Sequence, residues 1–259
     1  MISSSDSFLI DGKRFESRLI MGTSLYPNQS VLEKSLEISE TEIVTVSMRR
    51  MDLNSKINIF ESLKNKYTFL PNTAGCYTSK DVILTAELGR EVLKTNILKL
   101  ELIADDETLL PNSVELVKLA KILIKKRFKV LAYCSDDPIL CQKLEDIGCI
   151  AVMPLVSPIG SGLGIRNEHN LELIRNLCKG IVIVDAGIGK PSDASRVMEI
   201  GFDAILLNSS VARSLDPIKM AYAMKLAVKS GRAGFLAGII EKNKFAKRTS
   251  QIEGTITNF

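Results

Sequence analysis

A lysine and a glutamate alternate with leucines in the short apolar segment Ile-Leu-Lys-Leu-Glu-Leu-Ile at residues 97–103. Side chains alternate between two faces along a strand, so the three leucines share one face while Lys99 and Glu101 share the other. A charged lysine is costly to bury, so desolvation is expected to lower the pKa of Lys99, and a neutral amine is a nucleophile toward ketones. A structural Lys–Glu ion pair is the alternative interpretation.

A second carboxylate, Asp185, follows the apolar residues 181–184 and precedes Gly187 and Gly189. It is a candidate general acid or base beside Glu101, with a helix cap or a turn as its alternative role. The glycines lead into a helix that is expected to begin near residue 192. Glycines let the backbone approach a phosphate, and helix N-termini supply free N–H groups and a favourable dipole.

Amide and hydroxyl donors follow the next apolar segment as Asn208-Ser-Ser. Together with the glycines after Asp185, they predict a phosphate site, since many barrels bind phosphate with the loops after their last two strands. The alternative is that these glycines only turn the chain. The run Gly-Ser-Gly-Leu-Gly at residues 160–164 is in a position to close over the same ligand.

Eight short apolar segments, most of them rich in Ile, Val and Leu, recur along the chain as expected for buried parallel strands. They cover residues 19–23, 42–48, 69–75, 97–103, 129–135, 150–155, 181–187 and 204–210. Amphipathic stretches with helical spacing lie between them, at residues 79–94, 113–126, 138–147, 170–177, 192–200 and 217–230.

Strands that alternate with helices predict a parallel sheet of the α/β class. Eight of them in 259 residues favour a closed (β/α)8 TIM barrel over an open doubly wound sheet. No Gly-x-Gly-x-x-Gly follows the first strand, which argues against dinucleotide binding. We expect residues 1–259 to form one domain, with a tail from about residue 242 that is mobile or orders only with a ligand or partner. Residues 52–66 fit neither pattern.

Composition excludes several classes of protein. The net charge is +4, from 34 basic and 30 acidic residues with no basic block, which argues against nucleic-acid binding. The five cysteines form no CxxC pair and His169 is the single histidine, so no metal site is expected and His169 is interpreted as solvated or capping. Arg49 and Arg50 are either a solvated pair or contacts for a phosphate or an acidic partner.

The compartment is also suggested by the sequence. An odd number of cysteines without a secretion signal fits a reducing cytoplasm. No apolar stretch approaches the roughly 20 residues of a membrane span. We therefore expect a cytoplasmic protein that does not enter a membrane.

Taken together, the segments that carry these candidate residues resemble bacterial thiazole synthase, the barrel enzyme that makes the thiazole phosphate half of thiamine. The resemblance covers residues 19–238 in order and rests on LPNTAG from residue 70, LKLELI from residue 98, LLPN from residue 109, YCSDDP from residue 133, MPLVSPIGSGLGIRN from residue 153, VDAGIGKPSDA from residue 184, ILLNSSVA from residue 205 and DPIKMAYAMKLAVKSGR from residue 216.

The resemblance implies that Lys99 forms an imine with the ketone of 1-deoxy-D-xylulose 5-phosphate and that Glu101 and Asp185 are the acid/base carboxylates. It implies that the sugar phosphate is held by residues from three loops, namely Gly160, Ala186, Gly187, Asn208 and Ser209. Sulfur would arrive as a thiocarboxylate on a small ubiquitin-like sulfur-carrier protein. The third substrate would be dehydroglycine.

The family resemblance further implies homotetramers with the carrier protein at the barrel mouths, and it implies no metal and no organic cofactor. Two other functions remain open from the residues themselves. One is a lysine-dependent aldolase or another pentose-phosphate barrel enzyme. The other is a non-catalytic phosphosugar-binding barrel subunit, against which the joint presence of Lys99, Glu101 and Asp185 argues.

Overall fold

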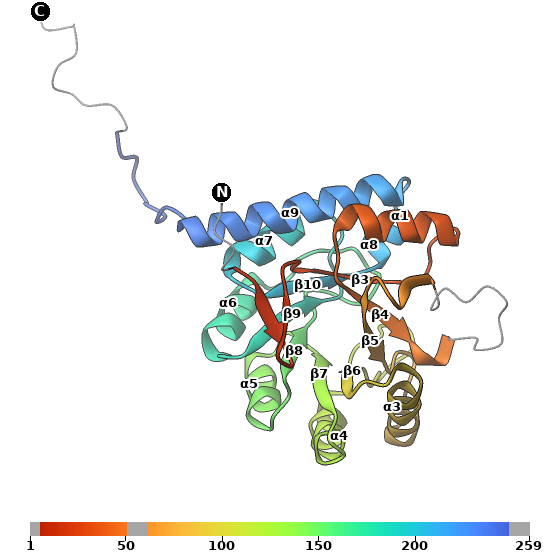
Figure 1. The fold of residues 1–259 in the computed structure, drawn as a ribbon. Helices are drawn as coiled ribbons and strands as arrows, with labels where there is room; N and C mark the ends of the chain where they lie inside the picture. Colours follow the sequence, from red (N-terminus) through yellow and green to blue (C-terminus); the bar gives the residue numbers. More distant parts are fainter. Residues whose placement is uncertain (1–5, 51–61, 249–259) are drawn as a thin grey trace, which may run out of the picture.

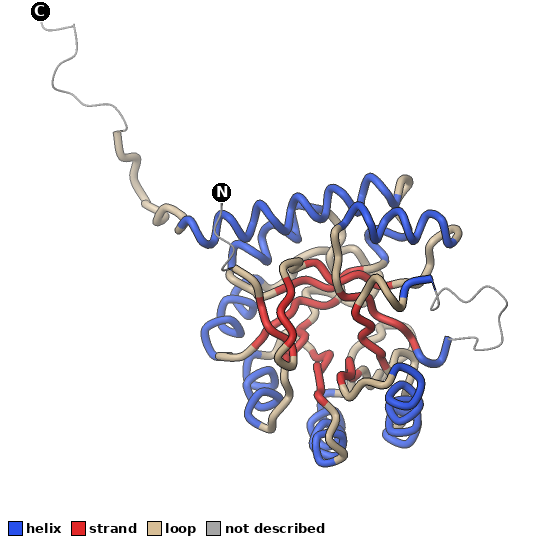
Figure 2. Tube along the Cα trace, viewed as in Figure 1, coloured by secondary structure: helices blue, strands red, loops and turns tan. Residues whose placement is uncertain are grey.

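Eight parallel strands close into a barrel in the computed structural model, which describes residues 6–50 and 62–248. The ring runs in the order β10-β3-β4-β5-β6-β7-β8-β9, and Figure 2 shows it enclosed by helices. The predicted (β/α)8 TIM barrel is therefore confirmed. The strands are β3 (Leu19–Gly22), β4 (Ile43–Ser47), β5 (Thr68–Asn72), β6 (Ile97–Leu100), β7 (Lys129–Cys134), β8 (Ala151–Pro154), β9 (Ile181–Asp185) and β10 (Ala204–Leu207).

Helices cover the outside of this ring and begin at recognisable capping residues. They are α1 (Gln29–Ser39), α3 (Ser79–Leu93), α4 (Ser113–Lys125), α5 (Pro138–Asp146), α6 (Glu168–Leu177), α7 (Pro191–Ile200), α8 (Ser209–Ala212) and α9 (Pro217–Ala237), with a 3-10 turn η1 at Met48–Arg50. At α1, α3, α4, α5, α6 and α9 the side chain of the preceding Asn, Thr or Asp accepts a hydrogen bond from a backbone N–H of the first turn. Such caps satisfy donors that a helix start leaves open.

The observed elements differ from the predicted ones in instructive ways. All eight strands end earlier than predicted, because the residues that follow them belong to the loops at the barrel mouth. Helix α1 was not predicted, because two of its four buried residues are Ser35 and Ser39, which bury their hydroxyls by donating to backbone carbonyls. Helix α9 continues past the expected end. A Cβ at Gly231 would lie 2.2 Å from the carbonyl oxygen of Ser195, so glycine permits close packing on α7.

A small hairpin closes one end of the barrel. Strands β1 (Phe8–Ile10) and β2 (Lys13–Phe15) are joined by Asp11-Gly12, both with positive φ, as a tight hairpin turn requires. Phe8, Ile10 and Phe15 join the cluster of apolar side chains that fills the barrel interior. Figure 1 shows this hairpin lying across one end of the ring. A ligand must therefore enter from the opposite end, where the strands have their carboxyl ends.

The predicted faces of the lysine strand are confirmed by the packing. Leu98, Leu100 and Leu102 belong to the cluster between the strands and the helices, and Lys99 faces the interior beside Glu101. The five cysteines are free, buried and part of the same outer cluster.

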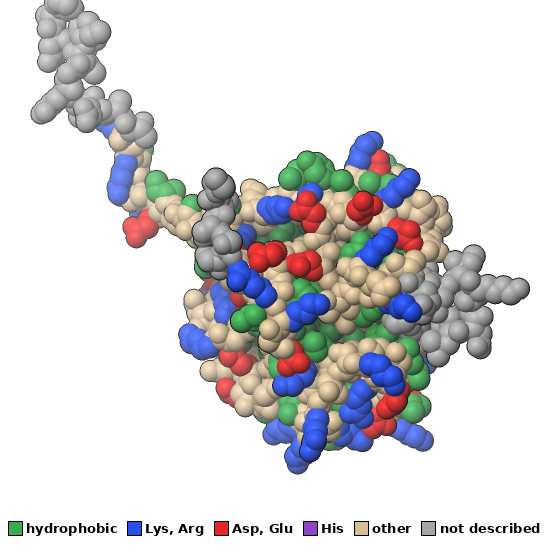
Figure 3. Space-filling model, viewed as in Figure 1, with side chains coloured by type: hydrophobic (Ala, Val, Ile, Leu, Met, Phe, Trp, Pro, Cys, Tyr) green, Lys and Arg blue, Asp and Glu red, His purple; other side chains and the backbone are tan. Residues whose placement is uncertain are grey.

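The surface carries both signs of charge. On the face seen in Figure 3, Lys and Arg side chains are interspersed with Asp and Glu. No helix of the described residues is long and apolar enough to cross a membrane. Residues 238–248 are exposed and lead away from the barrel beyond α9 (Figure 1). Most of the unassigned stretch 52–66 and the last part of the predicted tail, from residue 249, lie outside the described residues.

Candidate active site

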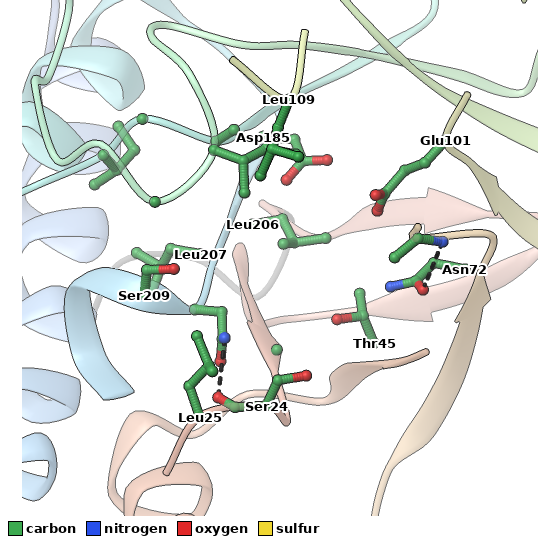
Figure 4. Close-up of a pocket in the computed structure, with 18 of the residues that line it drawn as sticks. Ser24, Leu25, Thr45, Asn72, Glu101, Leu109, Asp185, Leu206, Leu207 and Ser209 are labelled. Atoms are coloured by element: carbon green, nitrogen blue, oxygen red, sulfur yellow. Dashed lines mark hydrogen bonds between the residues drawn. The ribbon is translucent and has the colours of Figure 1, made fainter. Parts of the chain in front are cut away.

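A cavity of about 570 Å³ opens at the carboxyl ends of the barrel strands. All eight sequence-predicted site residues line it, together with others at or after β3, β4, β5, β6, β8, β9 and β10. Figure 4 shows the carboxylate of Glu101 on the opposite side of the cavity from Ser209, with Asp185 between them and Leu206 below. The predicted residues are Lys99, Glu101, Asp185, Gly160, Ala186, Gly187, Asn208 and Ser209.

Lys99 lies between two carboxylates deep in this cavity. Its Nζ is 2.8 Å from Oε1 of Glu101 and 2.6 Å from Oδ2 of Asp185. Lys99 lies on β6, Glu101 directly follows β6, and Asp185 is the last residue of β9. All three side chains are about 95% buried. Apart from Lys99, Oδ2 of Asp185 has no hydrogen-bond partner within the described residues. The ion pair that was one interpretation of the strand is thus present, and it includes a second acid.

The charge state of this trio differs from the expectation for Lys99. Burial alone lowers the pKa of Lys99, but the adjacent Asp185 and Glu101 outweigh it and hold the pKa above its usual value. The expected fall in pKa was therefore wrong for the free protein, because it considered desolvation without the second carboxylate. Burial raises the pKa of Asp185 to about 6. The positive charge of Lys99 lowers this pKa, and the negative charge of Glu101 raises it.

Glu101 is held by a residue to which the sequence assigned no role. The buried hydroxyl of Thr73 donates to the carbonyl oxygen of Glu101 at 2.7 Å and accepts from its backbone N–H at 2.8 Å. The backbone N–H of Thr73 also donates to the carbonyl of Lys99. Thr73 directly follows β5, so it ties the end of that strand to the continuation of β6. Its place in the LPNTAG segment was visible, but only strand pairing identified its partner.

An aromatic ring stands beside the lysine. Tyr133 on β7 is fully buried, and Nζ of Lys99 lies 5.8 Å from its ring centroid. Its hydroxyl donates weakly, at 3.4 Å, to the carbonyl of Leu109 in the loop after β6. Burial and the nearby carboxylates raise the pKa of Tyr133, so the phenol stays neutral. It packs in a small apolar cluster with Ile103 and Leu155, of which Ile103 lines the cavity.

The glycine loops after β8 and β9 pack against one another with almost no space between them. A Cβ at Gly187, where φ is +90°, would lie 2.2 Å from Oγ of Ser157, and one at Gly189 would lie 2.1 Å from the carbonyl oxygen of Gly162. The N–H of Gly164 donates to the carbonyl of Gly187. Gly160 and Gly162 of this run line the cavity, and the glycines are required by close contact as well as by turning.

The end of β10 completes the cavity. Nδ2 of Asn208 donates to the carbonyl of Ser24 at 3.0 Å, while its Oδ1 has no partner among the described residues. Gly22 at the end of β3 makes room, since a Cβ there would lie 2.5 Å from that of Asn208. Ser209 and Ser210 both line the cavity. Hydroxyl and amide groups therefore face the glycine loops across one end of the cavity.

Other residues considered from the sequence lie elsewhere. His169 is exposed on α6 and does not line the cavity. Arg49 is exposed and donates to the carbonyl of Gly75 at the rim. No cluster of His, Cys, Asp or Glu that could hold a metal ion occurs in residues 6–50 and 62–248. Arg213, which the sequence did not bring to attention, lines the cavity beside Ser209.

Comparisons with known proteins agree on one family. The family model of the thiazole biosynthesis protein ThiG matches residues 9–251. Thiazole synthase of Geobacter sulfurreducens is 50% identical over 99% of this chain and all of its own length, and that of Myxococcus xanthus is 48% identical over 96% and 97%.

Among solved structures, the Amycolatopsis orientalis BexX/CysO complex shares the fold with a TM-score of 0.82 at 23% identity, covering 91% of this chain and 97% of its own. Thiamine phosphate pyrophosphorylase of Pyrococcus furiosus has a TM-score of 0.57 at 15% identity, covering 83% and 96%. The chain therefore belongs to the ThiG family of thiazole biosynthesis proteins and is a thiazole-forming enzyme of thiamine biosynthesis.

Proposed function

We propose that this enzyme condenses 1-deoxy-D-xylulose 5-phosphate, dehydroglycine and sulfur from a thiocarboxylated carrier protein into the thiazole phosphate. The observation that carries the proposal is the buried amine of Lys99, which lies 2.6 and 2.8 Å from two carboxylates inside a cavity lined by glycine and Asn-Ser loops. We assign imine formation to Lys99 and proton transfer to Glu101 and Asp185. We assign the sugar phosphate to Gly160, Ala186, Gly187, Asn208 and Ser209.

The first step requires that Lys99 lose a proton. Asp185 is the acceptor that we assign, because its Oδ2 touches Nζ and its raised pKa makes it a better base than an ordinary aspartate. The transfer replaces two buried charges by two neutral groups, and burial favours the neutral form of both the amine and the carboxyl group. The amine then adds to the ketone carbon, and the ketone oxygen leaves as water after taking up one proton from the amine nitrogen and one from Asp185.

Later steps use the imine as an electron sink. Protons on the neighbouring carbon become acidic, and Glu101 is placed to remove one and return it to another carbon, which moves the carbonyl along the chain. The thiocarboxylate sulfur attacks this carbonyl, the acyl group of the carrier passes from sulfur to the former carbonyl oxygen, and the carrier leaves as its carboxylate, so that sulfur stays on the sugar carbon. The carbon of dehydroglycine then bonds to this sulfur, its nitrogen replaces the nitrogen of Lys99 and releases the lysine, and a sugar hydroxyl leaves as water. The fully buried ring of Tyr133 beside Lys99 limits access of water from that side.

The mouth of the cavity offers a surface for the carrier protein. Leu25 and Tyr77 line the cavity with half-exposed side chains, Leu163 is exposed within the glycine loop, and Leu215 is fully exposed after α8. Exposed apolar residues gathered around a polar cavity are typical of a protein docking site. The similar barrel of BexX is known in complex with CysO, which is compatible with a protein partner on this fold. We also propose a homotetramer, to be checked by light scattering.

The decisive experiment traps the imine. The protein is incubated with 1-deoxy-D-xylulose 5-phosphate, reduced with borohydride and mapped by mass spectrometry. We expect one adduct, on Lys99. It should be absent in Lys99→Arg, a variant that keeps the buried positive charge, and retained in the control Lys190→Ala. No adduct, or an adduct on another lysine while the variants remain folded, would contradict the proposal. Cleavage of the sugar without the carrier would favour the aldolase alternative.

A further inference from the structure

The side chain of Arg213 lies at the end of the cavity where the glycine loops meet β10. Arg213 follows the short helix α8, and its guanidinium reaches back over the loop after β8. A Cβ placed on Gly160 would lie 3.6 Å from Nη1 of Arg213 and 3.6 Å from Oγ of Ser209. The guanidinium and the serine hydroxyl thus face one common point above Gly160.

This guanidinium has no hydrogen bond or ion pair with any residue that the structure describes. Other arginines of the described chain are engaged: Arg18, Arg175, Arg196 and Arg232 each pair with a carboxylate. The backbone N–H of Arg213 donates to the carbonyl of Ser209, which fixes where the side chain begins. An anchored, exposed and unpaired guanidinium at the edge of a cavity is available to a ligand.

The charge balance of the cavity shows which ligand group fits. Its lining contains two basic residues, Lys99 and Arg213, and two acidic ones, Glu101 and Asp185. Lys99 is occupied by both carboxylates, so that trio leaves no positive charge for an entering anion. Backbone N–H groups and hydroxyls orient a phosphate but carry no net charge. Arginine supplies the charge and a fork of donors that matches phosphate oxygens.

We propose that Arg213 is the cation that binds the phosphate of the ketose substrate, completing a site whose other donors come from backbone and hydroxyl groups. This inference rests on the proposed function, because that function supplies a phosphorylated ketose. Arg213 would position the substrate, because it would contact the phosphate and not the reacting ketone. Arg213 also lines the adjoining groove, together with Leu215 and Lys219.

The test separates phosphate binding from catalysis. Binding of inorganic phosphate is measured by calorimetry for wild type, Arg213→Ala, Arg213→Lys and the control Lys219→Ala. Loss of a charge-assisted hydrogen bond is expected to weaken phosphate about 10- to 100-fold in Arg213→Ala. Arg213→Lys should recover part of this, and Lys219→Ala should change it less than about 2-fold, because Lys219 pairs with Asp216 outside the cavity.

Steady-state kinetics give the second readout. KM for the phosphorylated ketose should rise by a similar factor in Arg213→Ala with kcat nearly unchanged, and imine trapping on the non-phosphorylated ketose should be equal in variant and wild type. Equal phosphate affinity in wild type and Arg213→Ala, or an equal loss in Lys219→Ala, would overturn the inference while leaving the imine chemistry intact. Arg213-dependent phosphate binding without any imine on Lys99 would instead support the inference and contradict the proposed function.

Discussion

Replacing Thr73 by valine removes one hydroxyl and nearly nothing else, because the two side chains have the same shape. In the native protein this hydroxyl satisfies both the N–H and the carbonyl of Glu101, at 2.8 and 2.7 Å, in a fully buried position. Thr73→Val therefore leaves two backbone groups without partners. We expect it to loosen the segment that carries Glu101 and to lower both stability and activity.

The magnitude follows from the two lost bonds. Each buried polar group left unsatisfied costs about 1–3 kcal/mol, and burial of the added valine methyl offsets part of the cost of the two groups. The free energy of unfolding should therefore fall by roughly 2–4 kcal/mol. Imine trapping on Lys99 should be retained, because Lys99 is still held by Asp185. Later turnover, which needs a proton transferred by Glu101, should fall by about 10- to 100-fold with little change in KM.

The assay is urea unfolding followed by circular dichroism, together with kcat and KM at a temperature where all variants are folded. Thr85→Val is the matched control, because Thr85 is also a buried threonine but its hydroxyl contacts only the thiol of Cys76 at 3.4 Å. Thr73→Ser keeps the hydroxyl and should recover kcat. The reasoning is refuted if Thr73→Val and Thr85→Val lose the same stability, or if Thr73→Ser is as slow as Thr73→Val.

Three further predictions concern the proton acceptor, the glycine loops and the mouth. Imine trapping should increase as the pH rises through about 6, because Asp185 must be ionised to accept the lysine proton; a flat profile between pH 5 and 8, or the same profile in Asp185→Asn, would contradict this role. Gly189→Ala places a Cβ 2.1 Å from a facing carbonyl oxygen, so it should lower the free energy of unfolding by roughly 2–3 kcal/mol and weaken phosphate binding. Gly234→Ala, where a Cβ would have no atom nearer than 3.9 Å, should not destabilise the protein. Thermal melting and phosphate titration compare the two variants. Leu215→Asp should slow carrier-dependent turnover and leave imine trapping unchanged. The control Leu84→Asp, on an outer helix, should change neither turnover nor trapping, and equal effects of the two variants would place the carrier elsewhere.

Much of the fold could be predicted because its signals are local. Apolar segments of four to six residues separated by amphipathic stretches identify parallel strands and helices, and their number identifies a barrel. The hairpin of β1 and β2 was missed because its strands are three residues long and become buried only by plugging the barrel. Helix α1 was missed because buried serines interrupt its apolar stripe.

The site divides in the same way. Alternation along one strand was enough to predict that Lys99 and Glu101 face inward. The glycine and Asn-Ser segments were enough to identify residues that line the other end of the cavity. Barrel closure decided the rest, because it brings Asp185 from a distant strand to within 2.6 Å of Lys99 and so reverses the expected direction of the lysine pKa. Thr73 lies in the LPNTAG segment but was given no role, and Arg213 lies in no segment that the sequence singled out. Their partners are chosen by strand pairing and loop packing, which depend on atoms far apart in the chain.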